Sequence, residues 1–172
     1  MNIKNWKFVL FLITILLITG CAAVERRSIP ADIRDLAVVP FDNSSAEPGL
    51  ENILTDEVIQ QFLAEGQLNL VKPEQADVIL EGNIDRYRRI PLIYDDRDRV
   101  QQYRVRVDIS FELIDPETGR ALRSFENIYR QTSYSDLTPP RETEYDAQER
   151  VLYQLARDVV SGVVEGWPYM EN

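Results

Sequence analysis

Residues 100–114 read VQQYRVRVDISFELI, and this stretch decides the fold. Every second side chain over most of it is apolar: Tyr103, Val105, Val107, Ile109, Phe111 and Leu113. The side chains between them are polar or charged, so the pattern predicts a long strand with one buried face and one wet face. Residues 115–119 (DPETG) predict a hairpin turn. Residues 120–131 predict the return strand, at a sheet edge or with a bulge, because their alternation is weaker.

Two amphipathic helices are predicted outside this hairpin. Residues 50–66 place apolar residues at helical spacing and end in Gly66, a typical helix terminator. Residues 142–165 carry a second apolar stripe, and the acidic residues at its start suit the positive end of a helix dipole.

Shorter strands are predicted at residues 35–41, 68–71 and 77–89, with Gly82 marking a bulge or a close backbone approach. Residues 42–49 and 90–98 are predicted to be a loop and a connection. The expected order is β-α-β-β-β-β-α. Because each helix has one apolar stripe, we expect an α+β fold with two helices packed on one face of a mixed four- to five-stranded sheet. The opposite face would be polar and open, which is a liability unless it is charged or covered.

Composition excludes several classes of function. The chain has 172 residues, of which 44% are hydrophobic and 28% charged, as expected for one globular domain. Its net charge of −10 argues against a protein that coats nucleic acid. The absence of histidine excludes histidine triads and histidine metal sites. The single cysteine excludes an intrachain disulfide and a cysteine-rich zinc site.

The first twenty residues resemble a bacterial lipoprotein signal. Lys4 and Lys7 precede an apolar run over residues 8–18, which would span about 16 Å as a helix and is too short for a ~30 Å bilayer core. The run LITGC at residues 17–21 resembles a lipobox, which implies acylation of Cys21, for example by palmitate. Ala22, in place of aspartate, implies sorting to the outer membrane. The alternative is an ordinary signal peptide with a free cysteine.

These features divide the chain into three segments. We expect residues 1–20 to be a lipoprotein signal peptide, residues 21–34 a lipidated tether, and residues 35–172 a single α+β domain. No cofactor is expected other than the acyl chains on Cys21.

Three further stretches resemble the lipopolysaccharide-assembly lipoprotein family LptE. They are LAVVPFDNSSAEPGLENILTDEVIQQFLAEGQLNLV at residues 36–71, ADVILEGNIDRYRRIPLIYD at 76–95 and YRVRVDISFELIDPETG at 103–119. The resemblance implies a non-enzymatic outer-membrane protein that faces the periplasm and sits in the lumen of the β-barrel translocon LptD. Such a protein plugs the barrel, assists its assembly and contacts lipopolysaccharide. The first stretch also resembles other envelope lipoproteins, including penicillin-binding-protein activators.

Arginines are the candidate ligands for lipopolysaccharide phosphates, because a guanidinium binds phosphate with two parallel hydrogen bonds. Residues 85–106 hold seven arginines and four acidic residues. We select Arg97 and Arg99 in the connection, Arg104 and Arg106 on the wet face, and Arg141 before the last helix. The resemblance implies lipid contact for basic residues near Arg97, Arg99 and Arg141. The alternative for each arginine is a solvated surface residue in a weak ion pair.

Other functions remain open at this point. Asp95, Asp96 and Asp98 could hold a divalent cation, but Arg97 lies between them, which favours a solvated loop. A second possibility is another outer-membrane-anchored binding lipoprotein, such as an activator of a peptidoglycan synthase. A hydrolase would have to use paired carboxylates, since no Gly-x-Ser-x-Gly motif or glycine-rich phosphate loop is present.

Overall fold

The computed structural model describes residues 29–30, 33–135, 137 and 141–165. Its strands are β1 (Asp35–Val38), β2 (Asp42–Asn43), β3 (Asn69–Leu70), β4 (Val78–Tyr94), β5 (Val100–Ile114) and β6 (Ala121–Tyr134). Its helices are α2 (Leu50–Glu65), a 3-10 turn (Pro73–Gln75) and α3 (Glu144–Glu165). The expected α+β order is confirmed, with β2 and the 3-10 turn in addition.

The sheet is mixed, as predicted, with the strand order β3-β1-β4-β5-β6. β1 is parallel to both β3 and β4, whereas β4, β5 and β6 form an antiparallel meander. The prediction of a loop over residues 42–49 was wrong at its start, because Asp42 and Asn43 pair with Asn83 and Ile84 as β2. Two residues are too few to show an alternation, so this strand left no pattern in the sequence.

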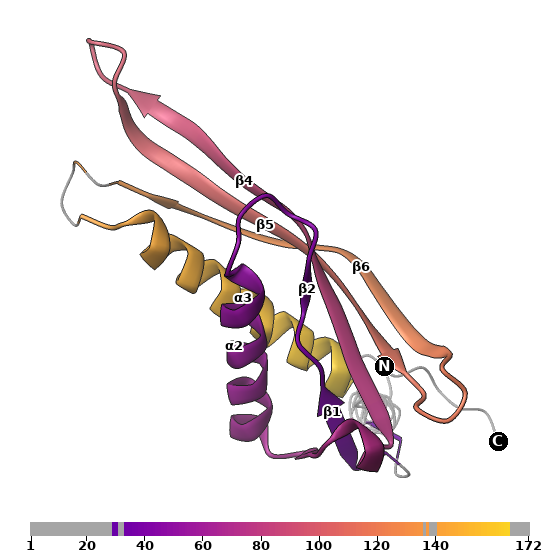
Figure 1. The fold of residues 1–172 in the computed structure, drawn as a ribbon. Coiled ribbons are helices and arrows are strands. Elements are labelled where there is room, and N and C mark those ends of the chain that lie inside the picture. Colours follow the sequence, from indigo (N-terminus) through magenta and orange to yellow (C-terminus); the bar gives the residue numbers. More distant parts are fainter. Residues whose placement is uncertain (1–28, 31–32, 136, 138–140, 166–172) are drawn as a thin grey trace, which may run out of the picture.

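Both helices lie on one face of the sheet (Figure 1). The apolar side chains of β5 from Val105 to Leu113 point toward the helices and are fully or almost fully buried. Phe111 stacks on Phe125 of β6 with ring centroids 4.4 Å apart. The predicted alternation of residues 100–114 is therefore the pattern that fixes which face the helices cover.

The close approach that was predicted at the backbone of Gly82 is present, and the ring of Phe41 makes it. A Cβ atom at this position would lie 2.2 Å from Cε1 of Phe41. Phe41 is 3% exposed, and its backbone N–H donates to the buried Oγ1 of Thr55 at 2.9 Å. The Phe41 ring therefore fills the space that a side chain on β4 would need.

The prediction of a connection over residues 90–98 was wrong at its start. β4 continues through Pro91 to Tyr94, and the turn comprises only residues 95–99. Proline is tolerated in a strand whose outer side is unpaired, because its missing N–H then breaks no bond of the ladder. β6 is the predicted edge strand, and its register against β5 shifts near Asn127, which has a φ of 59°.

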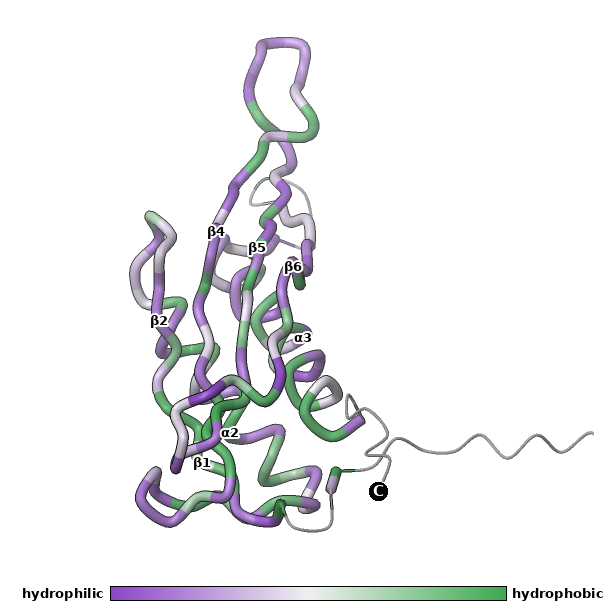
Figure 2. Tube along the Cα trace, turned by 90° about the vertical axis from the view of Figure 1, so that its right-hand side faces the viewer, coloured by the Kyte–Doolittle hydropathy of each residue, from purple (hydrophilic) through white to green (hydrophobic). Residues whose placement is uncertain are grey.

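The β4–β5 hairpin projects beyond both helices (Figures 1 and 2). Three apolar side chains are exposed on this projecting part of β4: Ile90, Ile93 and Tyr94. A two-stranded ribbon is only marginally stable by itself in water, so this segment gains little support from the domain core. Among the described helices, none is long and apolar enough to cross a membrane.

Candidate functional site

The open face of the sheet carries four arginines in its distal half, toward the hairpin tip. We call them the arginine face: Arg86, Arg88, Arg104 and Arg106. Arg88 lies directly opposite Arg106 in the ladder between β4 and β5, and Arg86 lies opposite Asp108. Like charges facing each other across two strands destabilise a sheet unless an anion lies between them.

Asp108 is the anion that this arrangement provides. Arg106 Nη2 lies 2.5 Å from Asp108 Oδ1, and Arg88 Nη2 lies 3.7 Å from Asp108 Oδ2. The hydrogen bonds from Arg106 hold the pKa of Asp108 below its usual value, with further lowering from Arg88 and Arg86. Among the described residues, no carboxylate forms an ion pair with Arg86 or Arg104. The arginine face therefore keeps a net positive charge.

Arg106 is also held from its other side. Its guanidinium carbon lies 3.7 Å from the centre of the Tyr129 ring, which is on β6. The contact orients the guanidinium over the open face, because an aromatic ring attracts a cation to its centre. Asp108 and Tyr129 therefore hold the Arg106 guanidinium in place, whereas Arg86 and Arg104 remain available to an anion.

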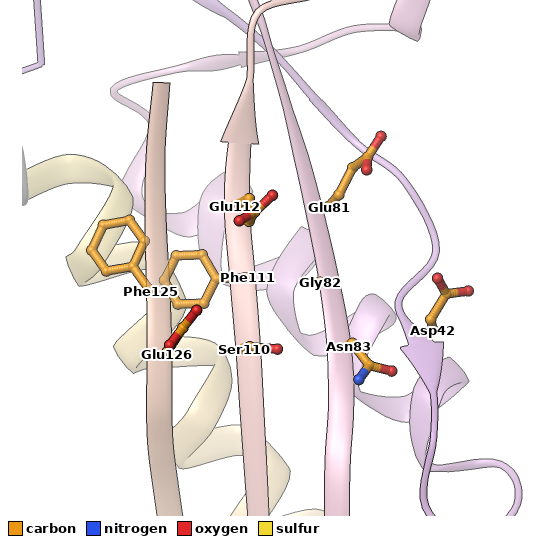
Figure 3. Close-up of a pocket in the computed structure, with 9 residues that line it drawn as sticks. All are labelled: Asp42, Glu81, Gly82, Asn83, Ser110, Phe111, Glu112, Phe125 and Glu126. Carbon is orange, nitrogen blue, oxygen red and sulfur yellow. The ribbon is translucent and has the colours of Figure 1, made fainter. Parts of the chain in front are cut away.

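The proximal half of the same face is acidic. A pocket of about 210 Å³ is lined by carboxylates from four neighbouring strands: Asp42, Glu81, Glu112 and Glu126 (Figure 3). Among the described residues, no group of three or more side chains has the arrangement of a metal site. The open face is thus positive toward the hairpin tip and negative toward the other end, so it would bind an anionic group at the tip end only.

Asp95 organises the hairpin tip. Its Oδ1 accepts the backbone N–H groups of Arg97 and Arg99 at 2.9 and 3.0 Å. Its Oδ2 lies 2.6 Å from Nη2 of Arg99. These bonds, led by the backbone N–H of Arg99, lower the pKa of Asp95 to about 2. Asp95 therefore serves the turn, and Arg97 is the predicted lipid-binding arginine that extends into solvent there without an ion pair among the described residues.

Lowering the pH should therefore loosen the hairpin tip only when the pH approaches 2. The pKa of Asp95 in the folded chain, about 2, is lower than the usual aspartate value of about 3.9. Its contribution to the tip is therefore present above pH ~4 and is lost as the pH falls toward 2. NMR chemical shifts of the Arg97 and Arg99 amides should titrate with a midpoint near 2. The Asp95→Asn variant should show no such step, and a midpoint near 4 in the unsubstituted chain would contradict the role of Asp95.

Arg141 lies apart from the other candidates. It is exposed in the segment between β6 and α3, close to residues outside the described ones. The neighbouring Glu142 pairs with Arg150 of α3 at 2.5 Å, which fixes the end of this segment on the helix. The structure thus brings Arg104 and Arg106 together on one face, adds Arg86 and Arg88 to them, and places Arg97, Arg99 and Arg141 on two separate connections at the distal end (Figure 1).

A polar cluster on the helix side was not predicted. Glu144, in the first turn of α3, accepts hydrogen bonds from the hydroxyls of Tyr87 at 2.5 Å and Tyr134 at 3.2 Å. Arg89 Nε lies 3.2 Å from the same carboxylate, and Gln148 Nε2 donates to Tyr87 at 3.1 Å. Burial raises the pKa of Tyr87 and raises that of Tyr134 to about 12, so both hydroxyls stay protonated donors. The cluster fastens the base of the projecting hairpin to α3.

Three predicted features lie outside the described residues. These are the signal peptide over residues 1–20, the acylated Cys21, and most of the tether over residues 21–34. They remain expectations from the sequence.

Comparison with known proteins shows several similar folds. No curated protein matches the chain. A PelC variant dodecamer from Paraburkholderia phytofirmans is 19% identical with a TM-score of 0.50, covering 78% of this chain and 91% of that one. A hypothetical protein from Chlamydia trachomatis is 12% identical with a TM-score of 0.50, covering 78% and 99%. Rare lipoprotein B from Shewanella oneidensis is 17% identical with a TM-score of 0.49, covering 75% and 92%. At these identities, the two structures with a TM-score of 0.50 show a shared fold only.

The sequence itself carries the family relationship. The family model described as LptE, lipopolysaccharide-assembly, matches residues 33–163. The match includes every strand of the sheet, all of α2, and α3 as far as Val163. The chain therefore belongs to the LptE family of lipopolysaccharide-assembly proteins.

Proposed function

We propose that this protein is a non-enzymatic outer-membrane lipoprotein, anchored through acyl chains on Cys21, that contacts lipopolysaccharide during its export. We further propose that it plugs the LptD β-barrel and assists the assembly of that barrel, facing the periplasm and the barrel lumen. Its family supports a role in lipopolysaccharide assembly.

The observation that carries the lipid contact is the charge imbalance of the arginine face. Arg86, Arg88 and Arg106 all act on one carboxylate, Asp108, and Arg104 has no ion pair among the described residues. Lipopolysaccharide carries phosphates, and arginine binds phosphate through two parallel hydrogen bonds. Because the other half of the face is acidic, bound phosphates would be directed toward the hairpin tip.

The uncovered parts of the domain support a partner that encloses it. The open sheet face is polar, and the projecting hairpin exposes Ile90, Ile93 and Tyr94. The interior of a large outer-membrane barrel is polar and can hold such a domain as a plug. A polar sheet face with an apolar hairpin end would then contact the lumen wall without exposing the hydrophobic core.

Isolation of the native complex tests the barrel partnership. The full chain, solubilised from the outer membrane with mild detergent, should co-purify with LptD. Depletion of the chain should reduce correctly assembled LptD and surface lipopolysaccharide. Normal amounts of both after depletion would overturn the proposal, and co-purification with a cell-wall synthase instead would favour a peptidoglycan-synthase activator.

Replacing Cys21 with serine should abolish acylation. Each buried methylene of an acyl chain contributes about 0.8 kcal/mol to membrane attachment, so several chains hold a protein firmly and their absence releases it. The substituted chain should incorporate no radioactive palmitate and should appear in the soluble periplasmic fraction. Mass spectrometry of the native chain showing an unmodified thiol would contradict the anchor, even with the fold intact.

A further inference from the structure

The outer edge of β4 is unpaired over its distal half. β5 pairs with β4 almost along its whole length on one side. On the other side β1 pairs with residues 78–80, and β2 pairs with residues 83–84. From Asp85 to Tyr94 no described strand lies along this side. Unpaired strand edges expose backbone donors and acceptors that can accept a further strand.

Pro91 shows which backbone groups face outward. Residues 86–91 pair with residues 108–103 of β5 without a shift, so the two-residue period holds through this stretch. A proline nitrogen has no hydrogen to donate, and it fits a ladder when it points away from the neighbouring strand. The N–H groups of Tyr87 and Arg89 therefore point away from β5 as well, while those of Arg88 and Ile90 point toward it.

The two edges of the sheet differ in how they are protected. On β6 the register shift near Asn127 interrupts the ladder, and α3 packs along the strand. On β4 the residues from Arg86 to Ile90 pair without interruption, and their side chains are exposed except that of Tyr87, which is partly buried. A regular stretch of edge can accept a partner strand, whereas a bulged one accepts it poorly.

The side chains beside this edge determine the kind of strand that fits. Arg86 and Arg88 flank it on the open face, and Arg89 flanks it on the helix face, with exposed side-chain fractions of 42% for Arg88 and 41% for Arg89. A second copy of the chain, pairing β4 with β4, would oppose these arginines to one another, and opposed like charges are unfavourable. An acidic strand would instead place carboxylates beside them.

We propose that the β4 edge over residues 85–92 binds an extended, acidic segment of a partner protein as an additional strand of the sheet. The backbone of Tyr87 and Arg89 provides the hydrogen bonds, and Arg86 and Arg88 select acidic side chains. Arg86 and Arg88 also belong to the arginine face, but the inference rests on the unpaired backbone of β4 and requires neither lipid binding nor the Cys21 anchor.

Three synthetic peptides test the proposal on the full chain in detergent, without lipopolysaccharide. The first alternates glutamate with threonine over ten positions. The second has lysine in place of each glutamate. The third is the glutamate peptide with every backbone nitrogen methylated, which keeps the charge but removes the donors on both edges that a ladder needs. NMR follows the amide exchange of Tyr87 and Arg89, with Arg88 and Ile90 as internal controls already bonded to β5.

The glutamate peptide, at ten times its Kd, should slow exchange of the Tyr87 and Arg89 amides by about tenfold and leave the Arg88 and Ile90 amides unchanged. The lysine peptide should bind at least about tenfold more weakly, since two or more ion pairs become repulsions. The methylated peptide should give no protection. Equal binding of the methylated and unmethylated peptides, or protection elsewhere in the sheet, would overturn strand addition while leaving the lipid contact untouched.

Discussion

Replacing Gly82 with alanine should lower the free energy of unfolding by about 1–3 kcal/mol, the usual cost of forcing extra volume into a packed core. The added methyl group would lie 2.2 Å from the Phe41 ring. Phe41 cannot move away easily, because its backbone is bonded to the buried Thr55 and its ring is 3% exposed. For a chain of this size the loss corresponds to a fall in melting temperature of roughly 2–12 °C. Urea unfolding followed by circular dichroism measures it.

A neighbouring and a compensating substitution isolate the cause. Glu81→Ala, one residue earlier on the solvent-facing side of β4, should change stability by less than about 0.5 kcal/mol. Phe41→Leu in the Gly82→Ala background should be less destabilising than the sum of the two single substitutions, because the smaller side chain makes room for the methyl group. Strictly additive effects would show that the two positions do not compete for the same space.

Replacing Arg86, Arg88 and Arg104 together with glutamine should weaken lipopolysaccharide binding by about tenfold to a hundredfold. Each partly exposed arginine–phosphate contact contributes on the order of 1 kcal/mol, and tenfold in affinity corresponds to about 1.4 kcal/mol. The set leaves Arg106 in place, so the pair with Asp108 and the stacking on Tyr129 persist. Titration with purified lipopolysaccharide, and with lipid from which the phosphates have been removed, measures the effect.

Two further triple variants complete the comparison. Arg97, Arg99 and Arg141 changed together to glutamate test the distal connections. Binding should again fall while the fold outside the hairpin tip is kept, because Arg99→Glu removes only the ion pair with Asp95 at the tip. Arg34, Arg120 and Arg157, which are exposed, changed together to glutamine remove the same number of cations elsewhere and should leave affinity within about twofold, since exposed charges beyond a Debye length act weakly. An arginine-face variant that binds as well as this control would reduce the arginine face to ordinary solvated surface.

The fold could be predicted wherever a side-chain period extended over several turns or strand residues. The alternation in residues 100–114 and the apolar stripes of the two helices give the element order and the shared helix side. Elements that are very short, or that contain a residue typical of loops, could not be predicted from the sequence. β2 has two residues, and the end of β4 contains Pro91, which local rules assign to a connection. Pro91 breaks no hydrogen bond of the ladder, because the outer side of β4 is unpaired there. The sequence of one segment does not reveal which strands will lie beside it, so this tolerance could not be predicted.

The site could be predicted in part from the same period. Alternation with buried Val105 and Val107 places Arg104 and Arg106 on the open face. Their meeting with Arg86 and Arg88 depends on the β4–β5 register, which the bulge near Asp85 shifts by one residue. The cluster around Glu144 joins residues 57 positions apart in the chain, Tyr87 and Glu144. Its only sequence signal was an acidic residue in the first turn of a helix, which is explained equally well by the helix dipole.

The position of β1 constrains the order in which the molecule can form. This first strand lies between β3 and β4, and both of its neighbours come later in the chain. A polypeptide that emerges N-terminus first from a ribosome or an export channel therefore presents β1 long before its partners exist. Leu36 and Ala37 are fully buried in the folded domain, and they stay exposed to water until β4 has emerged and paired with β1. Pairing of β1 with β4 therefore needs a longer stretch of chain to have emerged than a hairpin does, and a chaperone acting on the nascent chain would find its target at β1.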